Sequence, residues 1–188
     1  EMLAWIMQTG VDNYRNGTNT GGDVFTQLVD NVDRNGMGNE ASPNYNAMWP
    51  ANILPIAEIL AGYENGWAYD LFQHPKFIEM FTAHIPLVLA ETHHAQIGDS
   101  GSTAGMKLVD GMDTYISGFK HLKDPKLAQY IYLRNGKTTD GLRYGIFDRD
   151  PERLADEIEQ IIEEYGELPN DSEMLTGYGF AVLRDGEK

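Results

Sequence analysis

The chain has 188 residues, of which 41% are apolar and 11% aromatic, enough to bury one sizeable core but too few for two. Its 14 basic and 29 acidic residues give a net charge of −15, which repels phosphate backbones and anionic membrane surfaces. We therefore expect one globular domain that has neither nucleic acid nor a membrane as a partner. Cysteine is absent, which excludes disulfides, thiolate zinc sites and cysteine nucleophiles.

Two short helices are predicted at the beginning of the chain. Leu3, Ile6 and Met7 lie on one helical face, and the stretch 16–22, rich in Gly, Asn and Thr, ends that helix. Asp23 is a suitable N-cap for the second helix. The residues that the second helix would bury recur at helical spacing: Phe25, Leu28, Val29 and Val32.

A longer helix is predicted over residues 42–60. Ser42 supplies its N-cap and Pro43 its first helical residue. Pro50 and Pro55 lie inside this stretch. Because proline removes a backbone donor and clashes with the preceding turn, we expect the helix to kink or break near both.

Later helices are predicted where caps and apolar spacing agree. Their ranges are 68–72, 75–84, 113–121, 125–133 and 151–165. The last of them follows Asp150, its expected cap, and carries an acidic face that we interpret as a solvated surface. Residues 91–106, rich in Gly, Ser and Thr, are expected to form a long loop, and loops of that length are often functional.

The end of the chain alternates in the manner of a single β-strand, over residues 177–184. One strand is not stable alone, so we expect its sheet partners to lie beyond Lys188. The chain also begins at Glu1 without an initiator methionine and enters an apolar helical pattern directly. These features indicate an internal fragment of a longer, mainly α protein, whose helical hairpins could form a toroid or a solenoid.

One cluster of polar and aromatic residues could carry chemistry, although the sequence has no P-loop, dinucleotide fingerprint, zinc-protease motif or nucleophile elbow. Tyr45 falls in the first turn of its helix, where the positive end of the helix dipole would stabilise the phenolate that a tyrosine base requires. Trp49, one turn later, could stack on a sugar ring. Uncharged donors for a carboxylate or for sugar hydroxyls are Asn39, Asn44 and Asn46.

An alternative interpretation is a capped helix start at which Tyr45 and Trp49 pack into the core, and the residue types alone favour this alternative. His93, His94 and Asp99 could supply metal ligands, but adjacent histidines do not share a face and no third histidine lies nearby. We therefore expect no metal and no cofactor. A neutral His94 at the rim of a cleft would instead help to hold a sugar or a carboxylate.

The segment 38–46, Gly-Asn-Glu-Ala-Ser-Pro-Asn-Tyr-Asn, resembles the Asp-Gly…Glu-Gly-Ser-Pro-x-Tyr segment of the heparinase II/III-like polysaccharide lyases. This family includes heparinase and some alginate lyases. The likeness continues through 47–60, 71–77, 97–101 and 179–184. It implies that residues 1–170 are the C-terminal part of an incomplete (α/α) toroid, and that residues 171–188 are a linker and the first strand of a truncated β-sandwich domain.

The resemblance further implies cleavage of a uronate-containing anionic polysaccharide by β-elimination, with Tyr45 as the catalytic base and acid. Asn39, Asn44, Asn46, Trp49 and His94 are then expected to bind substrate. Family members also use an Asn or His upstream of the tyrosine and a His early in the sandwich. We expect both in the remaining parts of the parent polypeptide, so the isolated chain should be inactive. The family implies a secreted or periplasmic location.

Two other functions are compatible with the sequence. The chain could be a carbohydrate-binding or architectural helical domain without chemistry. It could also be a toroid glycoside hydrolase, for which Glu40 and Asp99 are the available carboxylate pair. Because the net charge opposes an anionic substrate, a lyase would need a local basic lining, supplied either by Arg15 and Arg34 or by the remaining parts of the parent polypeptide.

Overall fold

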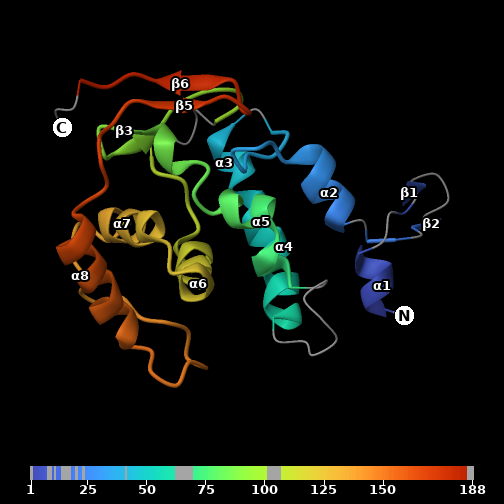
Figure 1. Cartoon of the computed structure of the whole chain (residues 1–188), viewed down its shortest axis with the longest axis horizontal. Coiled ribbons are helices and arrows are strands. Elements are labelled where there is room, and N and C mark those ends of the chain that lie inside the picture. Colours follow the sequence, from blue (N-terminus) through green and yellow to red (C-terminus); the bar gives the residue numbers. More distant parts are fainter. Residues whose placement is uncertain are drawn as a thin grey trace.

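The computed structural model describes residues 2–7, 10, 12–13, 18–19, 21–22, 24–40, 42–61, 70–100 and 107–185. Over these residues the chain is rich in helices, as predicted (Figure 1). The α-helices are α1 (Met2–Met7), α2 (Val24–Asn31), α3 (Pro43–Asn46), α4 (Met48–Leu60), α5 (Pro75–Met80), α6 (Met112–Leu122), α7 (Pro125–Arg134) and α8 (Arg153–Tyr165). Short 3₁₀ helices are η2 (Leu71–Gln73) and η3 (Ile85–Leu87). None of the described helices is long and apolar enough to span a membrane.

Short antiparallel strand pairs complete the described fold. They are β1 (Asp12–Asn13) with β2 (Thr18–Asn19), β3 (Val88–Leu89) with β4 (His93–His94), and β5 (Glu173–Leu175) with β6 (Phe180–Val182). The β3–β4 pair corrects the expectation that residues 91–106 form one long loop. Its turn holds Ala90 and Glu91 in the left-handed region, with φ of 49° and 58°. That conformation favours Gly or Asn, and neither residue type is present at this turn, so the sequence did not predict a hairpin here.

The predicted helix over 42–60 is divided, but at Ala47 and not at its prolines. α3 ends after one turn, and α4 continues through Pro50 and Pro55. Pro50 lies in the first turn of α4, where backbone N–H groups lack helical partners in any case. Pro55 lacks the N–H that would bond to the carbonyl of Ala51, and both residues are exposed, so this carbonyl does not have to be satisfied inside the core.

The helices of the second half lie close to their predicted ranges. Asp124 caps α7 by accepting a 2.7 Å hydrogen bond from the N–H of Lys126. α8 begins at Arg153, with Asp150 in the preceding turn, so the expected cap at Asp150 was wrong. α5 ends at Met80 and is followed by turns and η3, which shortens the predicted 75–84 helix. Within the described residues, the predicted helix over 68–72 corresponds only to the 3₁₀ helix η2. Asp23, the predicted N-cap of the second helix, lies outside the described residues.

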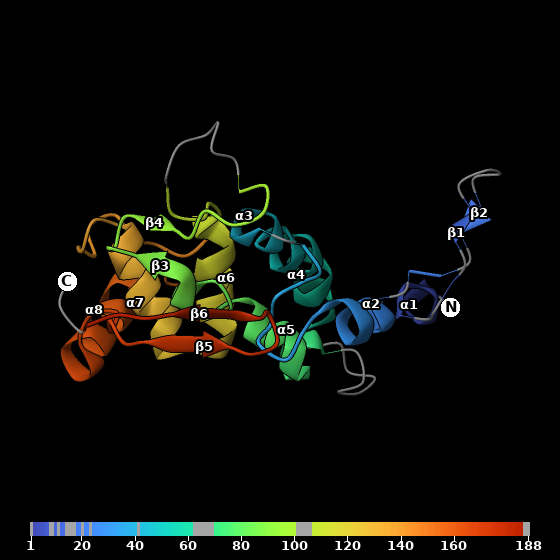
Figure 2. The same ribbon diagram turned by 90° about the horizontal axis from the view of Figure 1, so that it is seen from above.

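The terminal strand finds its partner inside the chain, which corrects the expectation of partners beyond Lys188. β6 pairs with β5 in the register Glu173↔Val182, Met174↔Ala181 and Leu175↔Phe180. The hairpin lies across one face of the molecule beside β3, as Figure 2 shows. One side of the hairpin buries apolar side chains in a small cluster: Met37, Ala83, Leu87, Ala95, Leu175 and Val182.

The main core lies between α4, α5, α6, α7 and α8. Its largest fully buried side chains are rings: Tyr115, Tyr130, Tyr144, Phe77, Phe81 and Phe119. Gly118 allows α6 to approach Phe81 closely, because a Cβ at that position would lie 2.5 Å from the ring. α1 and the β1–β2 pair lie at the opposite end of the molecule from α8 (Figures 1 and 2).

Candidate functional site

Tyr45 lies in the single turn of α3, and the two residues at the start of this helix fix its position. Ser42 adopts an extended conformation and its Oγ accepts a 3.3 Å hydrogen bond from the N–H of Tyr45. Pro43 fixes the first helical residue. The tyrosine side chain is 43% exposed, so the alternative that packs it into the core was wrong. Since α3 has only four residues, its dipole is that of one turn and adds little at the phenol.

Two surface hollows meet at Tyr45. The first, which we name the Trp49 hollow, has a volume of about 680 Å³ and is lined by Gly22, Val24, Gln27, Glu40, Tyr45, Met48, Trp49, Asn52, Ile53 and Asp99. The second, the Lys107 hollow, has a volume of about 390 Å³ and is lined by Asn44, Tyr45, Ala47, Met48, Ala51, Asp99, Ser100, Lys107, Val109, Asp110 and Gly111. Tyr45, Met48 and Asp99 belong to both. A ligand that extends from one hollow to the other therefore crosses the boundary that these three residues form, and the phenol is part of that boundary.

The three asparagines expected at the site have different surroundings. Asn44 lines the Lys107 hollow, and its Nδ2 donates a 2.9 Å hydrogen bond to the carbonyl of Ser100. Asn46 is buried and its Nδ2 donates to the carbonyl of Glu40 at 2.9 Å, so it holds the loop and does not line either hollow. Asn39 donates to Oδ1 of Asn31 and lies outside both hollows. Of the three, Asn44 is the one that a ligand at Tyr45 can reach.

Trp49 lines its hollow from α4 while its other side packs against the main core. The indole rests on Gly38, where a Cβ would lie 2.4 Å from Nε1 of the ring. A residue with a side chain at position 38 would displace the indole. Trp49 therefore keeps the cleft-wall position that the sequence predicted and also has the core contact of the alternative interpretation.

His94 is not at the rim of a cleft, which corrects its expected role. It lies in β4 and is 2% exposed, because pairing with β3 turns its side chain inward. Its Nδ1 accepts a 2.9 Å hydrogen bond from the N–H of Val109. Its own backbone N–H donates to the carbonyl of Lys107 at 3.1 Å. His94 thus holds the segment that carries Lys107.

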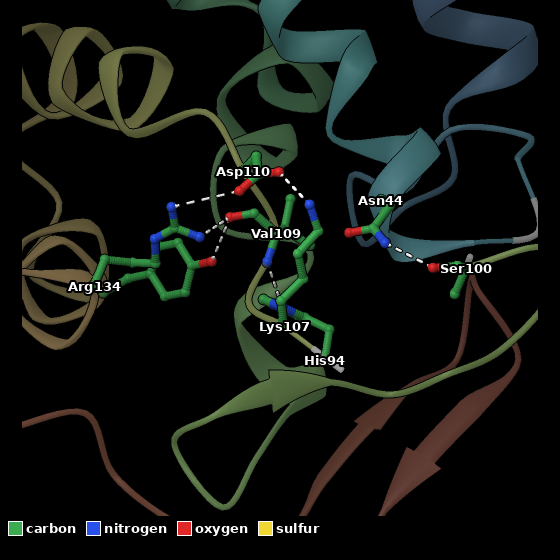
Figure 3. A network of polar contacts seen from close by, with 8 residues as sticks. Asn44, His94, Ser100, Lys107, Val109, Asp110 and Arg134 are labelled. Atoms are coloured by element: carbon green, nitrogen blue, oxygen red, sulfur yellow. Dashed lines mark hydrogen bonds and ion pairs between the residues drawn. The ribbon is translucent and has the colours of Figure 1, made fainter. Parts of the chain in front are cut away.

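The same segment is held from α7, as Figure 3 shows. The carbonyl of Val109 accepts hydrogen bonds from the hydroxyl of Tyr130, at 3.3 Å, and from the guanidinium of Arg134. The Nζ of Lys107 lies 2.6 Å from Oδ2 of Asp110, and Nη2 of Arg134 lies 3.9 Å from Oδ1 of the same carboxylate. Every backbone polar group of Val109 therefore has a side-chain partner.

Burial controls the charges beneath this segment. It lowers the pKa of His94 to about 3, assisted by the nearby charge of Arg134, and lowers the pKa of His84 well below its ordinary value. Burial also raises the pKa of Tyr130. The hydrogen bond from Lys107 lowers the pKa of Asp110. At neutral pH the two histidines are uncharged, and the charges at the hollow belong to Lys107 and the carboxylates.

The basic residues expected from the sequence do not supply this charge. Arg34 donates hydrogen bonds to Oγ1 and to the carbonyl of Thr176, both at 3.0 Å, and lines neither hollow. Arg15 lies outside the described residues. Lys107 was missed because its neighbours in the site come from distant parts of the chain, although the Lys107–Asp110 spacing was visible just before α6. No group of three or more His, Asp or Glu residues in the described ranges could hold a metal ion.

Comparisons with protein-family models, with curated proteins and with solved structures found no match to this chain.

Proposed function

We propose that the chain is the helical part of a polysaccharide lyase that cleaves a uronate-containing polysaccharide by β-elimination, with Tyr45 as base and acid. The observation that supports this most strongly is an exposed tyrosine where two hollows meet, in the segment that resembles the heparinase II/III-like lyases. Under this proposal residues 1–170 belong to an (α/α) toroid and residues 171–188 begin a β-sandwich. The consecutive packing of α6, α7 and α8 suits a toroid of helical hairpins.

The reaction requires few groups. The phenolate of Tyr45 removes the proton on C5 of the uronate, the electron pair forms a C4–C5 double bond, and the C4–O bond breaks. The phenol then returns the proton to the leaving oxygen. The negative charge that develops on the uronate needs preorganised donors. The resemblance assigns part of this stabilisation to residues of the parent polypeptide outside this chain. The parent polypeptide would be secreted or periplasmic.

The test is the ultraviolet absorbance of the unsaturated uronate product, measured on heparan, hyaluronan and alginate with the parent polypeptide. Tyr45→Phe is expected to lower the rate of product formation by about a hundredfold or more. Tyr165→Phe is the matched control, since Tyr165 is also exposed but lies on α8, and it should retain the full rate. Elimination that persists in Tyr45→Phe would overturn the proposal. Sugar binding without any product would favour the non-catalytic carbohydrate-binding domain.

A glycoside hydrolase is the second candidate, because Glu40 and Asp99 both line the Trp49 hollow. Hydrolysis uses two carboxyl groups across the scissile bond, one as acid and one as base or nucleophile. It yields a saturated product that does not absorb. Formation of new reducing ends without absorbance, lost in Glu40→Gln and retained in Tyr45→Phe, would establish this candidate in place of the lyase.

A further inference from the structure

The two hollows beside Tyr45 differ in charge. Among the described residues that line them, Lys107 is the one cation, and it belongs only to the smaller hollow. The larger hollow has an indole wall at Trp49 and a carboxylate at Glu40. A carboxylate of a ligand would be repelled by Glu40 and attracted by Lys107. Asp99 lines both hollows, and the carboxylate of Asp110 in the smaller hollow pairs with Lys107 and Arg134, so the hollows differ in charge through Lys107 and Glu40.

The backbone of Lys107 is held in place, but its ammonium makes only an exposed ion pair with Asp110. The carbonyl of Lys107 is fixed by the N–H of His94, and the next residue but one, Val109, is fixed at both ends of its backbone. The ammonium pairs with Asp110, but both side chains are exposed, and exposed ion pairs contribute little to stability. Arg134 stands on the other side of the Asp110 carboxylate. Lys107 can therefore turn to a ligand while Asp110 keeps a second cation.

Asn44 faces the same hollow. Figure 3 shows the side chain of Asn44 between Lys107 and Ser100, with its Nδ2 donating a hydrogen bond to the carbonyl of Ser100. That hydrogen bond fixes the orientation of the amide before a ligand arrives. Together the ammonium and the fixed amide form a polar corner next to the phenol, whereas the wall formed by Trp49 suits the face of a sugar ring.

We propose, on the basis of the function above, that Lys107 binds the carboxylate of the uronate that is cleaved and that the Trp49 hollow holds an uncharged sugar. The substrate class is then a polysaccharide in which uronates alternate with uncharged sugars. A polyuronate would place a second carboxylate in the hollow that Glu40 lines, and its binding would be weakened by like-charge repulsion.

The test is calorimetric binding to the full 188-residue chain of a hyaluronan hexasaccharide, its carboxyl-reduced form and a mannuronate hexasaccharide. Lys107→Gln is expected to weaken hyaluronan binding about tenfold or more, since a charge-assisted hydrogen bond is lost, and to leave binding of the carboxyl-reduced form unchanged. Lys120→Gln is the matched control. Lys120 is 43% exposed against 45% for Lys107 and pairs with Asp148 at 2.8 Å, but it lines neither hollow. Asp110→Asn is expected to tighten hyaluronan binding.

Equal hyaluronan binding by Lys107→Gln and the wild type would overturn the role of Lys107, while elimination that depends on Tyr45 would still support the lyase. Mannuronate binding as tight as hyaluronan binding would contradict the proposal that the Trp49 hollow holds an uncharged sugar. Binding that depends on Lys107, in a parent polypeptide that produces no unsaturated uronate, would reject the lyase and retain the carboxylate site. No binding of any of the three oligosaccharides by the chain would overturn the role of Lys107, whereas the elimination assay with the parent polypeptide decides the lyase proposal.

Discussion

His94 and Val109 are joined by a 2.9 Å hydrogen bond in which the buried imidazole Nδ1 accepts the backbone N–H. Because Nδ1 is the acceptor, the neutral ring carries its proton on Nε2. A second proton would have to replace this hydrogen bond and would place a charge in the core near Arg134. The ring of His84 lies 5.2 Å away, between centroids, and is equally buried. Two neutral histidines therefore support the segment that carries Lys107.

This arrangement predicts a loss of stability at mildly acidic pH. An unfolded histidine has a pKa near 6.5, whereas burial holds the pKa of His94 at about 3 and that of His84 well below 6.5. As the pH falls below about 6.5, the unfolded chain binds protons that the folded chain does not, so the free energy of unfolding decreases. Between about pH 7.5 and pH 5.5 the decrease is about 1.4 kcal/mol for each histidine. Urea unfolding at the two pH values measures it.

His94→Asn separates this effect from other titrations. Asparagine offers an acceptor for the N–H of Val109 but no titrating group, so the pH dependence should fall by about 1.4 kcal/mol relative to the wild type. Groups such as His74 and His121 titrate in both proteins and cancel. His93→Asn is the control and should retain the full dependence, since His84 and His94 remain. An unchanged pH dependence in His94→Asn would contradict the assignment of His94 as buried and neutral.

Local sequence predicted those parts of the fold that local interactions determine. α7 follows from its cap at Asp124, and α6 and α8 follow from apolar residues at helical spacing, which packing did not override. The division of α3 from α4 was predicted at the prolines, but Pro50 and Pro55 occupy positions that require no buried donor. The β5–β6 pairing was missed because β5 is only three residues long and has no alternation of its own.

At the site, too, the residues that belong to one local segment were predicted, and the residues that tertiary contacts bring there were not. Asn44, Tyr45 and Trp49 border the hollows from one segment of sequence, so their clustering could be predicted. Lys107 reaches the same place because β4 and α7 hold its segment, and no local pattern encodes that contact. His94 looked like an accessible ligand because the sequence around it is polar. Its burial depends on the pairing of β3 with β4, which positions its ring against those of His84 and Tyr130 in the core.

The contact between Gly38 and Trp49 predicts that the indole wall depends on a glycine. In Gly38→Ala the new Cβ would overlap the ring, and the adjustment is expected to cost about 1–3 kcal/mol of stability. The indole N–H resonance of Trp49 should shift, and hyaluronan binding should weaken while its dependence on Lys107 remains. Gly145→Ala is the control, because a Cβ there has no atom within 4 Å. Equal behaviour of the two variants in stability and in the indole resonance would contradict the close contact.

The β5–β6 hairpin predicts a sharp difference between two neighbouring residues of one strand. Leu175 is 6% exposed and packs in the cluster with Met37 and Leu87, whereas Met174 is 69% exposed on the opposite face. Leu175→Ala should therefore lower the free energy of unfolding by about 2–4 kcal/mol, and Met174→Ala by less than about 0.5 kcal/mol. Urea unfolding followed by circular dichroism measures both. If the hairpin is an integral part of the helical body, Leu175→Ala shifts one cooperative transition. A separate early transition, or equal small effects of the two variants, would mean that the hairpin does not share the stability of the helices.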